Sequence, residues 1–301
     1  RAYFHALARR NVYVRLADED YAEGMCGKLN KAMYGTRDAA QNWEYAYTEF
    51  LEPVGFVPCS MNPCVFYNKE KEIRLVVHGD DFTLSGSDED LDWFRSEISK
   101  KMDVKFRARL GPDQKDDKSV RILNRVVEWG KEGIWYEADQ RHSEIIKREL
   151  GLKEGSKGLS TPGISEKANK EAEVEEGSVH DPAAYRSVAA RANYLAQDRP
   201  DIQYAVKEIC KSMSKPAISD WPKAKRLGRY LCGSGRLRLL FRRQTLPEKL
   251  VVWSDSDHAG CKVTRKSTSG GCVMFGDHCL KSWSSMQDVA AKSSGEAEYY
   301  A

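Results

Sequence analysis

The chain has 301 residues, with 48 Lys and Arg against 45 Asp and Glu, for a formal net charge of +3. Hydrophobic residues make up 41% and charged residues 31%, a balance that is typical of folded globular domains and excludes a disordered chain. The longest apolar runs are far too short to span a bilayer, so the sequence predicts no transmembrane helix and no membrane partner. This length favours two or three domains over one.

The first clear periodic segment is helical. Apolar side chains recur at helical spacing at Trp43, Tyr47 and Phe50 or Leu51. Asp38 lies just before this segment, and aspartate is a preferred N-cap residue. The sequence therefore predicts a helix that begins after Asp38 and buries these rings on one face.

Two carboxylates follow at a predicted turn. The short apolar segments 73–77 and 82–84 flank the sequence HGDD, which predicts a β-hairpin with Asp80 and Asp81 at its tip. Adjacent carboxylates repel each other, so water or a divalent cation must offset that repulsion. The alternative is an ordinary acidic turn, because Asp and Gly are common turn residues.

Further elements lead to a change in composition. Ser87, followed three residues later by Asp90, predicts a capping box that begins a helix. A strand is expected near 133–136 and a helix over about 142–150. Residues 165–181 then hold six acids and almost no apolar side chain, which indicates an acidic linker or exposed loop.

After this linker, the spacing of the apolar residues changes along the chain from helical to strand-like. The pattern predicts helices and then strands, a succession typical of an α+β fold. The expected helices span about 183–196, 200–213 and 220–231; the expected strands span 250–253, 270–275 and 279–283, with a last helix from about 293.

A basic stretch lies among these helices. Residues 205–249 hold 12 Lys or Arg against three acids. Such a stretch suits a phosphate backbone, although a basic helical face is more often only solvated. Trp221 and Tyr230 are expected to pack helices together, although aromatic side chains can also stack on bases. The phosphate contacts would then come from Lys223, Lys225, Arg226 and Arg229.

The cysteines and histidines give no metal motif. The eight cysteines include no CxxC pair, so the sequence favours reduced intracellular thiols over disulfides or a zinc site. His258 and His278 are interpreted as surface or strand histidines rather than metal ligands.

Several segments, in order along the chain, resemble copia-type retrotransposon reverse transcriptases. They include RAYFHA, GKLNKAMYGTRDAAQNWE, YRSVAARANYLAQDRPDIQYAV, SDSDHAGCKVTRKSTSGG and GEAEYYA. The resemblance implies an α+β chain with a right-hand polymerase palm, fingers and thumb, a helical connection region and a truncated ribonuclease H-like domain. The expected regions are fingers and palm at 1–107, a thumb-like region at 108–165, the acidic linker at 166–181, the connection at 182–247 and the partial ribonuclease H-like domain at 248–301.

The resemblance also assigns a polymerase site. It implies that Asp80 and Asp81 are the paired catalytic carboxylates and hold two Mg²⁺ or Mn²⁺ ions, one at the primer hydroxyl and one at the triphosphate. His78 and Gly79 depart from the tyrosine and valine that the family usually has there. Tyr3 would pack under the incoming sugar, with ordinary core packing as the alternative. The expected substrate-binding residues are Tyr3, Tyr34, Gly35, Arg37 and His78.

A second site is implied near the end of the chain. Asp255, at the end of a predicted strand, and Glu296, on the helix that follows, would be catalytic metal ligands of the ribonuclease H-like domain. Without the resemblance they would be ordinary surface acids. The family's remaining carboxylates are expected before Arg1 and after Ala301, so both sites are expected to be incomplete and the chain inactive alone.

The implied function is RNA-directed DNA synthesis with associated ribonuclease H, within a retrotransposon polyprotein. The implied partners are an RNA or DNA template-primer, an RNA:DNA hybrid, deoxynucleoside triphosphates and other segments of the polyprotein. Two alternatives remain open: an inactive relic that binds nucleic acid, and a structural or interaction segment of a larger polyprotein. The expected compartment is the cytoplasm or the nucleus.

Overall fold

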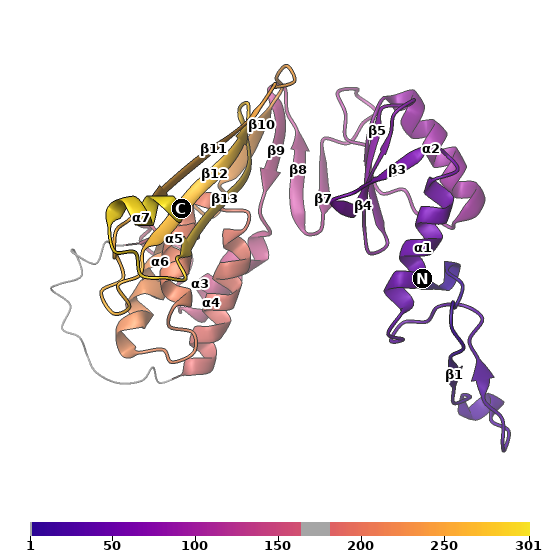
Figure 1. Cartoon of the computed structure of the whole chain (residues 1–301), viewed down its shortest axis with the longest axis horizontal. Coiled ribbons are helices and arrows are strands. Elements are labelled where there is room, and N and C mark those ends of the chain that lie inside the picture. The colour runs from indigo at the N-terminus through magenta and orange to yellow at the C-terminus, as the bar shows by residue number, and fades with distance from the viewer. Residues whose placement is uncertain (1, 164–180) are drawn as a thin grey trace. The chain divides into compact units, whose positions relative to one another are not determined.

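A computed structural model of the chain describes residues 2–163 and 181–301 (Figure 1). The chain forms two compact units, Arg1–Arg107 and Ala108–Ala301. Both combine helices with antiparallel sheets, which confirms the prediction of a mixed α and β chain. The predicted acidic linker lies outside the described residues except for Asp181, whose side chain caps the helix that follows.

The first unit is built on a four-stranded antiparallel sheet with two helices. The strands follow one another in space as they do in sequence, so each pair is a hairpin. A short two-stranded ribbon precedes them. The elements are η1 (Ala2–His5), β1 (Tyr13–Val14), η2 (Asp18–Asp20), β2 (Gly27–Lys28), α1 (Ala39–Leu51), β3 (Phe56–Cys59), β4 (Asn62–Asn68), β5 (Ile73–His78), β6 (Asp81–Ser85) and α2 (Asp88–Lys101).

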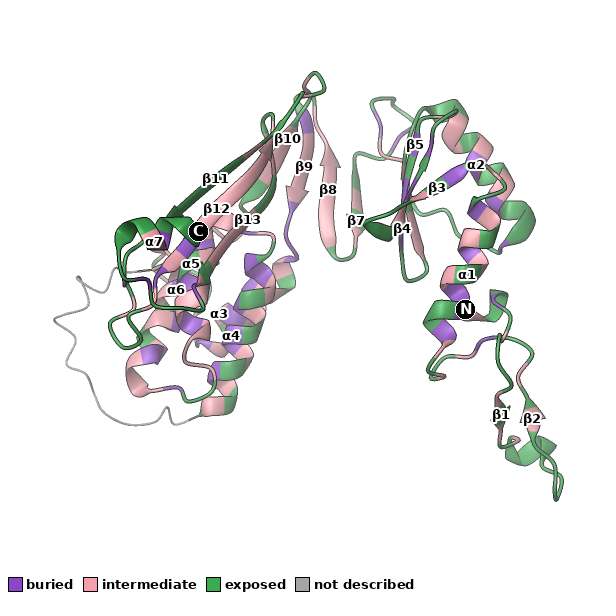
Figure 2. Ribbon diagram, in the orientation of Figure 1, coloured by how far each residue is buried: buried purple, intermediate pink, exposed green. Residues whose placement is uncertain are grey.

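Alternation in β5 decides which face of this sheet is covered. Ile73, Leu75 and Val77 are buried, whereas the residues between them are exposed (Figure 2). Helix α1 buries Trp43 and Tyr47 in the same core, as its helical spacing predicted. The predicted hairpin with acids at its tip is confirmed, because β5 and β6 pair and are separated only by Gly79 and Asp80.

The two predicted N-caps have different outcomes. Ser87 is the N-cap of α2, and its Oγ accepts a hydrogen bond from the backbone N–H of Asp90, as predicted. Asp38 occupies the N-cap position of α1, but its side chain makes no capping hydrogen bond. Its carboxylate instead pairs with the Arg10 guanidinium and accepts from the amide of Asn42. A nearby cation therefore outcompetes the backbone N–H groups at this cap.

The second unit contains a four-stranded sheet, a helical layer and a three-stranded sheet. In the first sheet β10 pairs with β9, although the four helices lie between them in sequence. The elements are β7 (Ser119–Ile122), β8 (Arg125–Trp129), β9 (Gly133–Glu137), α3 (Gln140–Glu149), α4 (Pro182–Ala196), η3 (Pro200–Ile202), α5 (Gln203–Cys210), η4 (Ile218–Asp220), α6 (Trp221–Gly233) and β10 (Arg238–Arg242).

The helical layer has its own core. Tyr185 of α4 is fully buried and donates its hydroxyl to the carbonyl of Ile209 in α5 at 2.8 Å. Alanines on α4 let the helices approach closely. Tyr230 is buried and Trp221 packs against this core, which confirms that both pack helices together. No helix in the described ranges is long and apolar enough to cross a bilayer.

The last sheet follows the predicted succession of three strands and a helix. It consists of β11 (Leu250–Ser256), β12 (Thr268–Phe275) and β13 (His278–Met286), followed by α7 (Ser294–Tyr299). Helix α5 packs against β13, and α7 lies against β11. Gln203 fastens α5 to the sheet by donating its amide to the carbonyl of Ser282 at 3.2 Å.

Candidate functional site

The β5–β6 turn presents two neighbouring carboxylates. Asp80 is exposed and Asp81 is partly exposed, directly opposite His78 in the strand register. Gly79 adopts φ of +60°, a conformation that costs glycine little and other residues more. A glycine at this place therefore lets the hairpin reverse tightly and leaves both carboxylates at its tip.

A buried tryptophan holds the turn from below. The indole Nε1–H of Trp43 donates to the carbonyl of Gly79 at 2.7 Å. Its ring also meets that of Phe82 edge to face, with centroids 6.3 Å apart. Because Trp43 is only 4% exposed, α1 fixes both ends of the acidic turn from a rigid core position. The sequence predicted this side chain as helix core, and nothing in its spacing revealed the bond to Gly79.

The only cation paired with these acids within the described residues is Arg107, whose Nη2 lies 3.2 Å from Oδ1 of Asp81. The Arg107 side chain is 67% exposed and that of Asp81 36% exposed. An ion pair this exposed is weak, so it can open at little cost. The contact was not visible in the sequence because Arg107 lies well beyond the hairpin.

The predicted substrate-binding aromatics meet each other. The rings of Tyr3 and Tyr34 stack with centroids 4.3 Å apart, and Tyr3 is partly buried against the core of the first unit. Gly35 has φ of +90°, and Arg37 is exposed. Tyr3 therefore packs against the core, as its alternative interpretation expected, while its neighbour Tyr34 remains 48% exposed.

Asp255 and Glu296 come from neighbouring elements of the last sheet. Asp255 is exposed near the end of β11, and Glu296 is half-buried on α7, which lies against that strand. The buried amide of Gln287 positions α7 by donating to the carbonyl of Ala297 at 2.8 Å. Glu296 already accepts the backbone N–H of Lys292 at 2.7 Å and the hydroxyl of Tyr300 at 3.3 Å.

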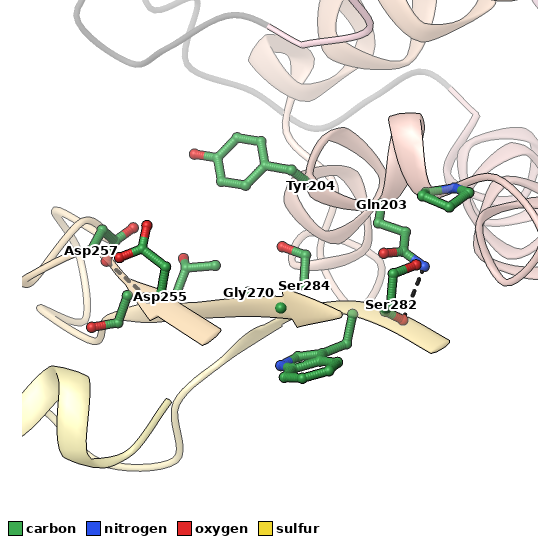
Figure 3. A pocket seen from close by; sticks show the side chains of 12 residues that line it. Gln203, Tyr204, Asp255, Asp257, Gly270, Ser282 and Ser284 are labelled. Carbon is green, nitrogen blue, oxygen red and sulfur yellow. Dashed lines mark hydrogen bonds between the residues drawn. The ribbon is translucent and has the colours of Figure 1, made fainter. Parts of the chain in front are cut away.

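An open hollow of about 420 Å³ lies beside Asp255 (Figure 3). Figure 3 shows Gln203 and Tyr204 of α5 on one side and Asp255 and Asp257 on the sheet side. Asp257 shapes the rim, since it accepts the backbone N–H groups of Thr268 and Gly260. The lining residues are Pro200, Gln203, Tyr204, Asp255, Ser256, Asp257, Thr268, Gly270, Gly271, Ser282, Trp283 and Ser284.

The four basic residues of α6 do not form one free patch. Lys223 pairs with Asp220 at 2.9 Å, and Lys225 is exposed. Arg226 donates to the carbonyl of Gly163 and the hydroxyl of Thr161, while Arg229 donates to the carbonyl of Lys157. These two arginines therefore fasten segment 157–163 to α6, a role that the basic composition could not reveal.

Comparison with known proteins shows which proteins the chain is similar to. Residues 1–112 match the reverse transcriptase (RNA-dependent DNA polymerase) family. Over its whole length the chain is 26% identical to the retrovirus-related Pol polyprotein from transposon TNT 1-94 of Nicotiana tabacum, of which it covers 23%. It is also 30% identical, over 94% of its length, to the Pol polyprotein from transposon RE2 of Arabidopsis thaliana, of which it covers 18%. The chain therefore contains a reverse transcriptase domain and is similar along its whole length to Pol polyproteins of plant copia-type transposons.

These matches confirm the resemblance drawn from the sequence motifs. The chain spans about a fifth of the length of these two Pol polyproteins, by the shares of 23% and 18%. It also matches an uncharacterized mitochondrial protein of Arabidopsis thaliana, at 35% identity over 54% of the chain and 65% of that protein.

Proposed function

We propose that this chain is the part of a retrotransposon Pol polyprotein that carries the catalytic hairpin of an RNA-directed DNA polymerase. The observation that carries the proposal is the pair of carboxylates at an exposed turn, held by Trp43 inside a region that matches the reverse transcriptase family. Its substrates would be a primed RNA or DNA template and deoxynucleoside triphosphates.

Asp80 and Asp81 are suitable ligands for Mg²⁺ or Mn²⁺. Hard divalent cations prefer oxygen donors, and Mg²⁺ is commonly held by one or two carboxylates together with substrate phosphates and water. The Arg107 guanidinium beside Asp81 shows that this turn already attracts a positive charge. The metal, when bound, would activate the primer hydroxyl and neutralise the triphosphate.

The residues around the acidic turn have separate roles in this proposal. Asp80 and Asp81 bind at the tip, Trp43 keeps the turn in place, and Arg107 leaves Asp81 when the carboxylate is engaged elsewhere. The stacked pair Tyr3 and Tyr34 supplies an aromatic surface for the nucleotide sugar, and Arg37 supplies a cation for phosphate.

The C-terminal region would contribute a ribonuclease H-like site for an RNA:DNA hybrid. Asp255 and Glu296 come from a strand and the helix packed on it, and the hollow beside Asp255 offers room for a backbone. Both carboxylates are oxygen donors of the kind that a two-metal nuclease uses. The hydrogen bonds from Lys292 and Tyr300 hold the Glu296 carboxylate in a fixed orientation.

A second candidate function is nucleic-acid binding without catalysis. The observation that favours it concerns the donor sets: within residues 2–163 and 181–301, no three His, Cys, Asp or Glu side chains gather where they could hold a metal. Each acidic site thus offers a pair of carboxylates, and the two candidates differ in whether that pair binds a metal.

A measurement of Mn²⁺ binding distinguishes the polymerase proposal from nucleic-acid binding without catalysis. Binding is followed by electron paramagnetic resonance, with primed template and a deoxynucleoside triphosphate present. We expect Asp80→Asn to weaken Mn²⁺ binding about tenfold or more, because one of two charged ligands is lost. Glu70→Gln, an exposed acid on the same unit, serves as the control and should leave binding unchanged. Equal Mn²⁺ binding by the wild-type chain and Asp80→Asn would favour the non-catalytic alternative.

A further inference from the structure

A basic hollow of about 350 Å³ lies at the β1–β2 ribbon, apart from the acidic hairpin in sequence. Its lining contributes three cations and two amides but no carboxylate, and Figure 2 shows the ribbon largely exposed. The lining residues are Ala8, Arg9, Arg10, Asn11, Lys28, Leu29 and Asn30.

Backbone pairing brings the two halves of this hollow together. The N–H of Ala8 donates to the carbonyl of Asn30 at 3.1 Å, and the N–H of Leu29 donates to the carbonyl of Val12 at 2.9 Å. Segments 8–12 and 28–30 are therefore held side by side as antiparallel chains. The positive charges of the hollow thus come from two segments that the ribbon fixes relative to each other.

The two arginines of the hollow are held in ion pairs, but each keeps N–H donors for another anion. Arg9 pairs with Glu49 and lies over the ring of Tyr45 at 4.1 Å, while Arg10 pairs with Asp38 at 2.9 Å. The hydrogen bond from Arg10 holds the pKa of Asp38 below its usual range. Each guanidinium has five N–H donors, so donors remain for a second anion. Both pairs are exposed on the arginine side, at 45% and 55%, and can adjust at little cost.

Lys28 adds a third cation that has no partner among the described residues, and it is exposed. It lies directly opposite Tyr13 in the strand register, and directly opposite residues of an antiparallel pair project from the same face. Tyr13 is 59% exposed. The side chains of Lys28 and Tyr13 therefore project from one face of the ribbon, and Lys28 also lines the hollow.

The other face of the ribbon is closed by apolar side chains. A Cβ placed on Gly27 would lie 3.1 Å from Cδ2 of Leu16 and 3.4 Å from Cγ2 of Val14. Leu16 and Val14 thus cover the backbone on that side. The ribbon has one apolar, covered face and one open face that carries Tyr13 and Lys28.

We propose that this open face binds single-stranded nucleic acid, with a backbone phosphate in the hollow among Arg9, Arg10 and Lys28 and an unpaired base stacked on Tyr13. Cationic grooves with exposed aromatic rings are how proteins bind unpaired strands without reading their sequence. A duplex fits less well, because its bases are already stacked on each other. The proposal rests on the proposed function, since a template-dependent polymerase must hold an unpaired template strand.

Fluorescence anisotropy with a labelled single-stranded oligodeoxyribonucleotide tests the cations, using the full 301-residue chain with EDTA present. We expect Lys28→Ala to weaken binding several-fold and to reduce the slope of log K against log salt by about 0.7, the value for one lost phosphate contact on a single strand. The double variant Arg9→Gln with Arg10→Gln should reduce the affinity and the salt slope further. Lys69→Ala, an exposed lysine on the β4–β5 turn, is the matched control and should change neither.

Substitution of the tyrosine tests the stacking. Tyr13→Ala should weaken binding about tenfold with little change in salt slope, because stacking involves no counterion release. Tyr13→Phe should bind like the wild type, since the ring and not the hydroxyl makes the contact. The side chains of Lys28 and Tyr13 are exposed, so their substitution should not disturb the fold. If an alanine variant unfolds, the conservative variants Lys28→Arg and Tyr13→Phe should still bind like the wild type.

Three results would overturn the proposal: no binding by the wild-type chain, variants of the hollow that match Lys69→Ala, or a duplex of equal length that binds as tightly with the same dependence on Tyr13. These results are independent of Asp80, because EDTA removes divalent metal. Failure of the polymerase proposal would instead appear in the Mn²⁺ experiment while the ribbon variants still lose affinity.

Discussion

The two units hold their sheets and helices together by different contacts. In the first unit, α1 meets the sheet through rings packed edge to face, with Tyr47 touching Trp43, Phe66 and Phe82. In the second unit, the first sheet meets the helices through charged hydrogen bonds. One carboxylate oxygen of Asp198 accepts a hydrogen bond from the Nε–H of Arg125 on β8 at 2.9 Å. The other oxygen accepts one from the hydroxyl of Tyr136 on β9 at 2.7 Å.

This difference matters for how each unit presents its acids. Asp80 and Asp81 are neighbours in the chain, so one anchored turn is enough to hold them together. Asp255 and Glu296 are far apart in sequence, and their elements lie together only because α7 packs on β11. The first pair therefore depends on a local aromatic support, and the second pair depends on the whole C-terminal sheet.

The largest effect is expected from the aromatic support. Trp43→Ala should lower the free energy of unfolding of the first unit by about 3–5 kcal/mol, the usual cost of deleting a large buried ring. Hydrogen exchange read by mass spectrometry should show lost protection in α1, β5 and β6 but not beyond residue 107.

A milder variant separates packing from the hydrogen bond. Trp43→Phe keeps a ring in the core but removes the donor to Gly79, so we expect a loss of about 1–2 kcal/mol, concentrated at the β5–β6 turn. If Trp43→Ala instead loosened the second unit as strongly as the first, the contrast between the units would be wrong.

The second effect concerns the C-terminal sheet. A Cβ on Gly271 would lie 2.4 Å from both the carbonyl oxygen of Trp253 and Cζ2 of Trp283. Gly271→Ala should therefore destabilise the second unit by about 1–3 kcal/mol, the range seen for overpacking, and distort the β11–β12 pairing that positions Asp255. Gly295→Ala is the control, because its nearest neighbour is 4.0 Å away and alanine favours the helix. Urea unfolding of both variants measures the difference.

Regular periodicity explains which elements could be predicted from the sequence. The helix with Trp43 and Tyr47 repeats at helical spacing, the acidic hairpin and the last three strands are short apolar runs bounded by turn residues, and the structure contains each of them. The hairpin of β3 and β4 was missed, since Pro58 interrupts a short strand and proline is unfavourable within a sheet.

Contacts between distant segments could not be predicted. Strand β10 pairs with β9 about a hundred positions earlier, and nothing in its own sequence indicates that partner. In the candidate sites, the carboxylates were visible as residues, but their supports were not: Trp43 binding Gly79, and Gln287 holding Ala297. Those supports depend on tertiary packing, which no local pattern encodes.

The third effect is a difference in acid sensitivity. Burial tends to raise the pKa of Asp201, but hydrogen bonds from Arg199 and Tyr230 outweigh it and hold the pKa below the ordinary 3.8. Because the folded-state pKa is the lower one, this carboxylate stabilises the fold above the unfolded pKa, and the stabilisation is lost as the pH falls through the folded pKa. We expect the second unit to lose stability from this group as the pH falls below about 4.

The control for this prediction removes the titrating group. Asp201→Asn should lower stability at neutral pH and flatten its dependence below about pH 4. In the first unit the carboxylates with a lowered pKa include Asp38 and Asp90, whereas in the second unit Glu137, Asp139, Glu208 and Asp220 join Asp201, so acid should affect the first unit less. Urea unfolding at each pH, resolved by hydrogen exchange, measures both units. Equal acid loss in the two units would contradict the contrast.

The smallest effect concerns a single helix cap in the first unit. Ser87→Ala removes the hydroxyl that accepts the N–H of Asp90, so we expect a loss of about 1 kcal/mol and faster exchange in the first turn of α2. Ser99→Ala is the matched control on the same helix: its hydroxyl only bonds back to the carbonyl of Arg95, so its loss should be neutral or slightly stabilising. Because the rings of Phe56 and Phe94 still pack α2 against the sheet, the cap variant should leave the acidic turn unchanged. Faster exchange at the β5–β6 turn in Ser87→Ala would show that the turn depends on α2 as well as on Trp43.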